Sequence, residues 1–192
     1  MTTLKLKTPK LVGHRGCAAY APENSLEGIH TAADMEIPWV ELDVKLTRDQ
    51  VPILFHDDTL DRTTNGAGKV AETDYADLKQ LEAGSWFADS FAGIKIPTLE
   101  EALDVLLERD LGLNLEIKPC EGREKETAEV ALDVLSQIWD EPDKLIVSSF
   151  QHVSLECAQD MMEEFPRGLL LPEEWPENWA EIADYLKVAA FV

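Results

Sequence analysis

The chain has 192 residues, with 17 Lys or Arg against 38 Asp or Glu, so its formal net charge is −21. This length fits one domain with a small insert, and a hydrophobic content of 45% suits a globular chain with a buried core. The acidic balance excludes a general nucleic-acid binder and disfavours docking on anionic membranes.

Short apolar runs alternate with longer amphipathic stretches, which is typical of strands that alternate with helices. Thr98, followed by Glu101, is expected to form a capping box at one helix start, and Thr73 is expected to cap another helix. In chain order, the predicted elements are a strand at 10–14, a helix at 24–35, strands at 39–46 and 51–56, helices at 74–81 and 98–109, a strand at 113–118, a helix at 123–139, a strand at 145–150, a helix at 152–163, a strand at 168–171, a helix at 176–186 and a strand at 188–192.

This alternation predicts parallel β-α-β units and leaves two α/β architectures open, a doubly wound sheet and a (β/α)8 TIM barrel. The first strand ends in G-H-R-G and lacks the G-x-G-x-x-G pattern of dinucleotide-binding folds, which favours the barrel. Residues 57–97 break the alternation with turn residues and one short helix. We interpret this segment as an insertion of about forty residues on a barrel loop, where functional residues often lie.

Charged residues inside an apolar strand mark the candidate site. In W-V-E-L-D-V-K, the side chains of Glu41, Asp43 and Lys45 share one face, because side chains alternate along a strand. The simpler explanation is a half-exposed strand with a solvated face. The functional explanation is a pair of carboxylates aimed into the mouth of a barrel, which suits a hard cation.

The strand L-N-L-E-I-K-P repeats this pattern. Glu116 and Lys118 share a face, and charges inside a covered sheet are costly unless they are paired or bound to a metal. A structural ion pair and a site for a cation are both open on this segment alone.

His56 is expected to return to the same place through a hairpin. Residues 47–50 are too few for a parallel crossover, so the strands on either side should pair antiparallel. If Leu46 opposes Val51, then Glu41 opposes His56. A slip of one residue would turn His56 away.

His14 and Arg15 close the first strand and form a pair suited to an anion. Arginine offers a two-pronged hydrogen bond to phosphate, and histidine can transfer a proton. His30 and His152 are expected to be structural or exposed.

Neither targeting signals nor paired cysteines are recognisable in the sequence. It contains no run of about 18 apolar residues, and its first residues lack the pattern of a signal peptide. Cys17, Cys120 and Cys157 are widely spaced and show no C-x-x-C pattern. We therefore expect a cytoplasmic protein without disulfides or a membrane partner.

A series of short motifs resembles the glycerophosphodiester phosphodiesterase family. They are G-H-R-G at 13–16, A-P-E-N-S at 21–25, E-L-D at 41–43, H-D at 56–57 followed by L-D-R-T-T-N-G at 60–66, and E-I-K-P at 116–119. Three further motifs are most similar to bacterial cytoplasmic members linked to glycerol-3-phosphate uptake: A-G-S-W-F at 83–87, S-S-F at 148–150 and R-G-L-L-L-P at 167–172. The resemblance implies a TIM barrel with a small insertion after the second strand, which is where residues 57–97 fall.

The resemblance also implies the chemistry of the site. Glu41, Asp43 and Glu116 would ligate one divalent cation, with Mg²⁺ or Ca²⁺ preferred and Mn²⁺ as a further option. His14 and His56 would be the acid–base pair.

Arg15 and Lys118 would hold the phosphate, and Asn24 would steady the metal ligands from behind. Trp86 in the insertion is expected either to close over the glycerol end of the substrate or to belong only to the small core of the insertion. Cys17, at a position that is often Gly in the family, is expected near the phosphate.

The family barrel has eight strands, and this chain ends in what we interpret as its sixth. We expect residues 1–192 to form one incomplete barrel domain of a protein that continues for about 50–60 residues. The first and sixth strands should then be separated by about 14 Å, or three strand spacings, instead of being paired.

Three functions are weighed. The first is hydrolysis of glycerophosphodiesters to glycerol 3-phosphate and an alcohol. This reaction would depend on a metal ion and on acid–base catalysis by histidine, and the enzyme would be a monomer or a homodimer. The second is a phospholipase D-type lyase that acts on lysolipids. The third is a non-catalytic barrel that binds a phosphorylated ligand.

Overall fold

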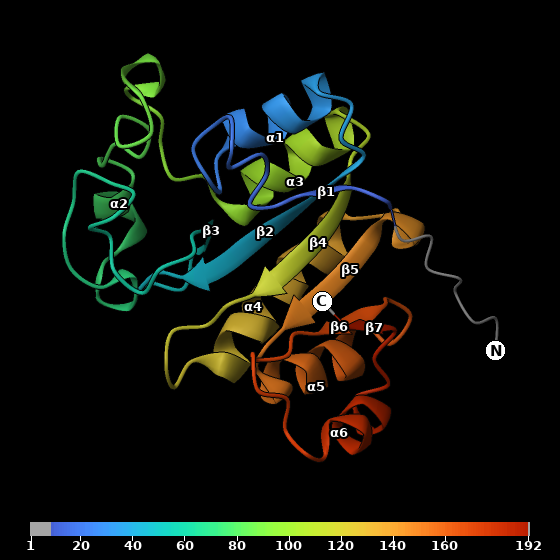
Figure 1. The fold of residues 1–192 in the computed structure, drawn as a ribbon. Coiled ribbons are helices and arrows are strands. Elements are labelled where there is room, and N and C mark those ends of the chain that lie inside the picture. Colours follow the sequence, from blue (N-terminus) through green and yellow to red (C-terminus); the bar gives the residue numbers. More distant parts are fainter. Residues whose placement is uncertain (1–8, 192) are drawn as a thin grey trace.

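A computed structural model describes residues 9–191 of the chain (Figure 1). The strands are β1 (Val12–Gly13), β2 (Trp39–Leu46), β3 (Pro52–Leu54), β4 (Gly112–Ile117), β5 (Leu145–Ser149), β6 (Arg167–Leu169) and β7 (Ala190–Phe191). The α-helices are α1 (Leu26–Asp34), α2 (Tyr75–Leu78), α3 (Leu99–Glu108), α4 (Glu124–Ile138), α5 (His152–Met161) and α6 (Trp179–Tyr185). Each predicted element has a counterpart, and the last residue of the last predicted strand lies outside the described residues.

Six parallel strands form a curled sheet in the order β1-β2-β4-β5-β6-β7, and β3 pairs antiparallel with β2. Helices α1, α3, α4 and α5 pack one against the next in chain order, as a layer outside the sheet (Figure 1). Strands in sequential order with helices on the outer face make part of a (β/α)8 barrel, so the doubly wound alternative is wrong. Within residues 9–191, β1 and β7 form the two ends of the sheet and do not pair. The 14 Å spacing between them remains a prediction.

Helix capping follows the sequence at one start and departs from it at another. Thr98 and Glu101 form the predicted capping box at α3. Asp74, not Thr73, is the residue that precedes α2. The Thr73 hydroxyl instead donates to the carbonyl of Lys69, which places Thr73 in the preceding turn and corrects the prediction.

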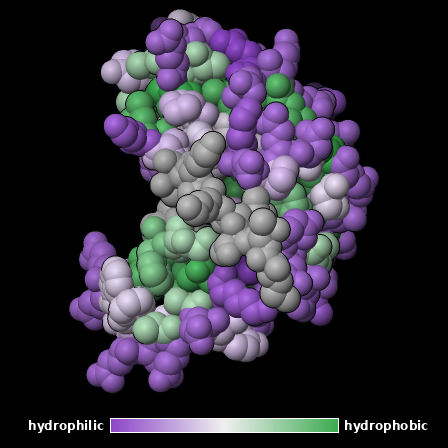
Figure 2. Space-filling view, turned by 90° about the vertical axis from the view of Figure 1, so that its right-hand side faces the viewer, coloured by the Kyte–Doolittle hydropathy of each residue, from purple (hydrophilic) through white to green (hydrophobic). Residues whose placement is uncertain are grey.

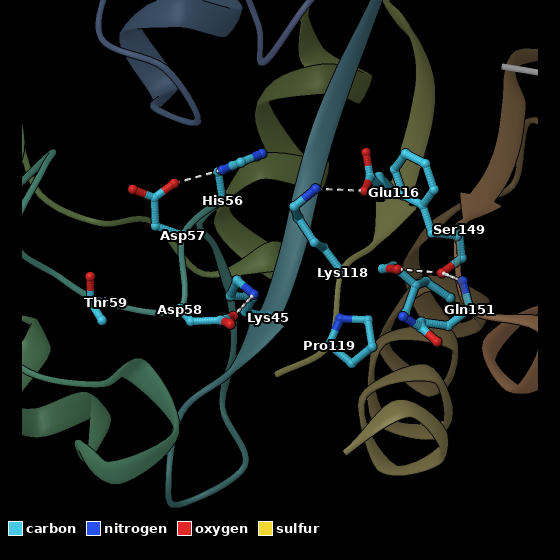
Figure 3. Close-up of a pocket in the computed structure, with 12 residues that line it drawn as sticks. Lys45, His56, Asp57, Asp58, Thr59, Glu116, Lys118, Pro119, Ser149 and Gln151 are labelled. Carbon is cyan, nitrogen blue, oxygen red and sulfur yellow. Dashed lines mark hydrogen bonds and ion pairs between the residues drawn. The ribbon is translucent and has the colours of Figure 1, made fainter. Parts of the chain in front are cut away.

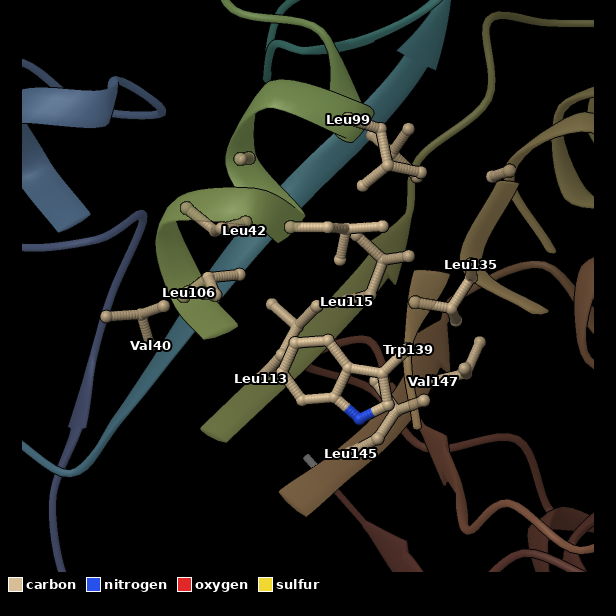
Figure 4. Close-up of a cluster of buried hydrophobic side chains, with 14 of the residues drawn as sticks. Val40, Leu42, Leu99, Leu106, Leu113, Leu115, Leu135, Trp139, Leu145 and Val147 are labelled. Carbon is tan, nitrogen blue, oxygen red and sulfur yellow. The ribbon is translucent and has the colours of Figure 1, made fainter. Parts of the chain in front are cut away.

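The hydrophobic core lies between the sheet and the outer helices. Alternate residues of β2 and β4, such as Leu42 and Leu115, point outward and pack against α3 and α4 (Figure 4). All eight residues of β2 are buried, so the half-exposed explanation for this strand is wrong. The charged side chains of β2 therefore face an enclosed interior rather than water.

Residues 57–97 lie beside the sheet and pack around a small cluster of their own. It joins Ile53 and Phe55 to Leu60, Val70 and Leu78. Two short 3-10 helices, Val70–Glu72 and Asp89–Phe91, and the four-residue α2 are the regular elements of this segment. A third, Pro142–Lys144, precedes β5.

The C-terminal strand β7 is partly exposed although its residues are apolar. Its apolar run suggests a strand covered on both faces, yet Phe191 is 46% exposed and stacks on Trp175. Within the described residues β7 is the last strand of the sheet and pairs only with β6. On the side of the molecule that Figure 2 shows, hydrophobic residues lie in both the upper and the lower part, among hydrophilic ones. No helix within residues 9–191 is both long and apolar enough to cross a bilayer.

Candidate active site

Three acidic side chains meet on the inner face of β2 and β4. Asp43 is the register partner of Glu116, and Glu41 lies two residues before Asp43 on the same face. One carboxylate oxygen of each residue lies within 4.8 Å of the other two. The predicted carboxylate cluster is therefore assembled by the pairing of two neighbouring strands.

Burial and mutual repulsion make this cluster electrostatically costly. Burial, together with the neighbouring charge of Asp43, raises the pKa of Glu41 to about 8. The same two causes raise the pKa of Glu116. The Oε1 atom of Glu41 is buried and has no hydrogen-bond partner among the described residues. A positive charge placed between the three oxygens would relieve the repulsion.

The loop after β1 holds Glu41 by backbone contacts. The amide of Arg15 donates to Glu41 Oε2 at 2.8 Å, and the amide of Gly16 donates to the carbonyl of Glu41 at 3.0 Å. Arg15 has φ 50° and Gly16 has φ 88°, the left-handed turn that brings both amides round to β2. A Cβ at Gly13 would lie 1.9 Å from the carbonyl oxygen of Gly16, so the tight turn also requires glycine where β1 ends.

Asn24 fixes Asp43 through a reciprocal pair of hydrogen bonds. Its Nδ2 donates to Asp43 Oδ2 at 2.8 Å, and its Oδ1 accepts from the amide of Asp43 at 3.0 Å. Ser25, the next residue, caps α1 by accepting from the amide of Gly28, so α1 anchors this contact. Asn24 thus holds the carboxylate of Asp43, and its role in the function of the site stays a prediction.

Two cations lie beside the cluster, as the sequence predicts. Lys118 Nζ donates to Glu116 Oε1 at 2.9 Å and lies 3.8 Å from Asp43 Oδ1 (Figure 3). Arg15 Nε lies 3.6 Å from Asp43 Oδ2. The ion pair left open for Glu116 and Lys118 is present, and the same Glu116 also belongs to the carboxylate cluster.

The two predicted histidines both line the cavity at this cluster. His14 Nε2 is 3.9 Å from Glu41 Oε2, and its pKa is lowered by partial burial and by the neighbouring Arg15. His56 Nδ1 lies 2.7 Å from Asp57 Oδ1 (Figure 3). The carboxylate of Asp57 has a pKa held below its usual range, mainly by hydrogen bonds from Arg62. An ionised carboxylate only accepts hydrogen bonds, so Asp57 requires a proton on Nδ1 of His56.

The hairpin that delivers His56 exists, but its predicted register is wrong by one residue. Leu46 opposes Pro52, not Val51. The reason lies in the turn, where the amide of Thr47 donates to the carbonyl of Val51 and the Thr47 hydroxyl accepts from the amide of Val51. Thr47 thus takes the partner that had been assigned to Leu46.

His56 reaches the cluster despite this shift because it no longer belongs to the strand. The pairing of β3 stops at Leu54, and the amide of Phe55 makes one more bond, to the carbonyl of Asp43. Beyond it, the chain leaves the ladder, and His56 turns into a cavity that it shares with His14 and Glu41.

Two cavities meet at this point. One of about 360 Å³ is lined by residues of the cluster and by both histidines, and one of about 540 Å³ extends past Lys118 toward the ends of β3 and β5 (Figure 3). They share the side chains of His56, Glu116, Lys118 and Phe150. A substrate held over the carboxylates would therefore have room on either side of His56.

Sequence reasoning missed several residues of the site. Asn114, the register partner of Glu41, lines the smaller cavity and has a buried Oδ1 without a partner in the described part of the chain. Its position two residues before Glu116 on a strand was a usable signal. Lys45, assigned to the charged face, is buried and donates to Asp58 at 2.7 Å. Phe150 was named only as the last residue of the S-S-F motif and was given no role in the site.

Some predicted residues lie elsewhere. Cys17 is buried in the core with its sulfur 3.8 Å from that of Met35, so its side chain does not face the phosphate site. Trp86 packs edge-on against Phe87 in the 57–97 segment and does not line either cavity at the cluster. His30 contacts Arg109 on the outer helices. The three cysteines are free thiols.

Comparison with known proteins agrees with this geometry. Residues 14–192 match the model of the glycerophosphoryl diester phosphodiesterase family. The chain belongs to this family. It is 34% identical over 169 residues to a glycerophosphodiester phosphodiesterase of Caldanaerobacter subterraneus subsp. tengcongensis, a match that covers 88% of this chain and 69% of that protein. With a glycerophosphodiester phosphodiesterase of Bacillus subtilis it shares 35% identity over 83% of this chain and 58% of that protein.

Solved structures give the same assignment. A phosphodiesterase of Oleispira antarctica, in complex with the product sn-glycerol-3-phosphate, superposes with a TM-score of 0.91 at 43% identity over 95% of this chain and 74% of that one. A glycerophosphodiester phosphodiesterase of Thermotoga maritima superposes with a TM-score of 0.72 at 28% identity over 96% of this chain and 73% of that one. The chain thus spans about three fifths to three quarters of the length of these four relatives.

Proposed function

We propose that the protein hydrolyses glycerophosphodiesters to glycerol 3-phosphate and an alcohol. The observation that carries this proposal is the arrangement around one cavity of three carboxylates, two cations and two imidazoles. A phosphodiester needs countercharge for its non-bridging oxygens, a base for the attacking group and an acid for the leaving alcohol. The product bound to the Oleispira antarctica relative supports glycerol 3-phosphate as the phosphorylated product.

The residues present fit a hard divalent cation. Glu41, Asp43 and Glu116 offer only oxygen donors, their oxygens converge, and Glu41 Oε1 lacks a partner among the described groups. Such donors suit Mg²⁺, Ca²⁺ or Mn²⁺. When bound, the cation would supply Lewis-acid polarisation of a phosphate oxygen.

The cationic side chains would bind the phosphate from the other side. Arg15 and Lys118 lie beside Asp43 and Glu116, and both side chains remain partly exposed. Their charges would neutralise the charge that builds on the non-bridging oxygens during attack at phosphorus. They would also offset the repulsion that a chain of charge −21 exerts on an anionic substrate.

The histidines would divide the proton transfers. We assign His56, whose ring is held at Nδ1 by Asp57, as the acid that protonates the leaving alcohol when the P–O bond breaks. His14, close to Glu41, is then the base that takes the proton from the attacking oxygen. The attacking oxygen belongs either to water or to the neighbouring glycerol hydroxyl, which would give a cyclic phosphate first.

An assay with glycerophosphocholine tests this function. We expect release of glycerol 3-phosphate and choline with a divalent cation present, loss of activity in excess chelator, and recovery when the cation is restored. A cyclic phosphate seen by phosphorus NMR would identify attack by the glycerol hydroxyl. Cleavage of a lysophospholipid in preference to glycerophosphocholine would favour the lyase instead. Binding of phosphate without turnover of either substrate would favour the non-catalytic barrel.

A further inference from the structure

A single guanidinium from the 57–97 segment ties together two loops that flank the site. Arg62 donates twice to Glu23, from Nη1 to Oε2 at 2.9 Å and from Nη2 to Oε1 at 2.7 Å. It also donates twice to Asp57, from Nε to Oδ2 at 2.6 Å and from Nη2 to Oδ1 at 2.9 Å. Planar guanidinium is suited to such two-pronged contacts, which fix the plane of each carboxylate.

Each of these carboxylates in turn holds a residue of the proposed machinery. Glu23 Oε1 accepts from Arg15 Nη1 at 2.8 Å, and Asp57 Oδ1 contacts His56 Nδ1 at 2.7 Å. Arg62 itself lines neither of the two cavities at the cluster. It therefore acts on the site only through the two carboxylates that it orients.

The charges favour this chain of contacts. Burial would raise the pKa of Glu23, but hydrogen bonds from Arg62 and Arg15 outweigh it and hold that pKa below its usual value. The side chain of Glu23 is only 10% exposed, so without Arg62 its negative charge would be paired with Arg15 alone. Arg15 would then be drawn toward Glu23 and away from the phosphate position beside Asp43.

We propose that Arg62 is a positioning residue that sets the orientation of Arg15 and His56 together, through Glu23 and Asp57. This inference rests on the proposed function for its effect on catalysis. It also assigns a task to the L-D-R-T-T-N-G motif and to the insertion, which otherwise contribute no residue to the carboxylate cluster. The turn that carries Arg62 is closed by the Thr64 hydroxyl, which donates to the carbonyl of Leu60 at 2.7 Å.

Two variants and one matched control test the proposal on the full chain. Arg62→Gln removes the charge and both two-pronged contacts. Arg62→Lys keeps the charge but cannot satisfy two carboxylates in one plane. Arg48→Gln is the control, because Arg48 makes a similar two-pronged pair with Asp74 at the same segment but away from the cavities.

The first readout does not depend on activity. Nitrogen NMR of histidine-labelled protein, read at the high-pH plateau where imidazoles are neutral, reports the tautomer of each ring. We expect His56 to carry its proton on Nδ1 in the wild type and in Arg48→Gln. In Arg62→Gln we expect a mixture of tautomers, because Asp57 is then free to rotate toward solvent. An unchanged His56 tautomer in Arg62→Gln would overturn the proposal, whatever reaction the protein catalyses.

The second readout is the split of the kinetic constants with glycerophosphocholine. We expect Arg62→Gln to lower kcat about 10–100-fold, as for other residues that orient catalytic groups, and to raise KM because Arg15 is displaced. Arg62→Lys should stay closer to Arg62→Gln than to the wild type, and Arg48→Gln should match the wild type. A wild-type rate in Arg62→Lys would reduce the role of Arg62 to its charge and contradict the positioning claim. Absence of turnover in the wild type would instead contradict the proposed function, and the NMR readout would still decide on Arg62.

Discussion

The inner faces of β2 and β4 differ sharply from those of β5 and β6, although all four strands belong to the same sheet. Asn114 and Glu116 on β4 are the register partners of Ile146 and Ser148 on β5, and Ser148 is the partner of Gly168 on β6. The inner face of the sheet thus carries charged and amide groups on β2 and β4, and apolar or small residues on β5 and β6. The outward faces of β2, β4 and β5 show no such change, because all three strands pack Leu and Val against helices. On β6 the register partner of Val147 is the buried Arg167.

This difference separates what specifies the fold from what specifies the chemistry. The outward apolar stripe recurs on β2, β4 and β5 and buries the surface that drives folding. The inward residues are free to vary, and those of β2 and β4 carry groups whose burial opposes folding unless countercharge is supplied. Arg15 and Lys118, at the ends of β1 and β4, supply part of it.

The largest expected effect comes from removing a central carboxylate from the charged inner face of β2 and β4. Asp43→Ala removes one predicted metal ligand and the partner of Asn24. Loss of groups that merely orient metal ligands costs 10–100-fold, so we expect the affinity for a divalent cation to fall by at least about 100-fold, with a parallel loss of activity. Calorimetric titration with Ca²⁺ and Mg²⁺ measures the affinity directly.

The control for this change is Asp104→Asn, which alters an exposed carboxylate on α3. It should leave both the affinity and the rate unchanged. Equal cation affinity in Asp43→Ala and the wild type would remove the carboxylate cluster from metal binding.

The histidines are expected to have the next largest effects. His14→Ala and His56→Ala should each lower kcat about 10²–10⁴-fold while cation affinity is kept, because proton transfer by a placed side chain contributes that factor. A 4-nitrophenyl leaving group needs no protonation. It should therefore restore much of the rate to His56→Ala and little to His14→Ala. Rescue of His14→Ala instead would exchange the two roles, and wild-type rates in either variant would exclude that residue from the mechanism.

A matched pair of buried polar atoms tests the comparison between the two halves. Asn114 Oδ1 and Ser148 Oγ are both buried without a hydrogen-bond partner among the described residues. Asn114 lies on the charged inner face of β4, and Ser148 lies on the uncharged inner face of β5. Asn114→Ala should lower kcat/KM about tenfold, since it removes an oxygen that lines the cavity and that a substrate hydroxyl or the cation could engage. Ser148→Ala should change kcat/KM by less than about threefold, because an unpaired hydroxyl contributes no interaction to lose. Similar losses in both would show that the two halves contribute equally to the site.

Most of the fold and the first layer of the site could be predicted from the sequence. Period-two alternation placed Glu41 and Asp43 on one face, and the motifs placed His14, His56 and Glu116 together. The face shared by Glu41 and Asp43 depends on local spacing, which a sequence states directly, whereas the grouping of His14, His56 and Glu116 came from the resemblance of their motifs to a known family. The element order likewise follows from patterns within single segments.

The remaining features depend on contacts between distant segments. The register of β3 was wrong by one residue because Thr47 bonds to Val51, and a turn of this kind is decided by one hydroxyl. The link from Arg62 to Glu23 joins residues 39 positions apart, which no local pattern predicts. Cys17 was misplaced because its direction is set by a tight turn at the end of β1 and by packing against Met35.

The smallest expected effect lies in the 57–97 segment, where Trp86 is 39% exposed. Its Nε1 donates to the carbonyl of Ala83 at 2.9 Å, and Ala83 lines a narrow crevice together with Glu23 and His56. We expect Trp86→Ala to raise KM for glycerophosphodiesters about threefold, within the range of single aromatic contacts, and to leave KM for a bis-nitrophenyl phosphodiester unchanged.

Phe87→Ala separates this role from a structural one. Phe87 packs edge-on between Trp86 and Phe91, so its loss should loosen the same aromatic group without removing the indole ring. If Trp86 contacts the glycerol end of the substrate, the selective rise in KM should appear in Trp86→Ala and be absent from Phe87→Ala. If the aromatic residues only form the small core of the segment, both variants should instead lower the melting temperature and change KM for the two substrates equally. The residues on the inner face of β2 and β4 would then recognise the glycerol group without a contact from Trp86.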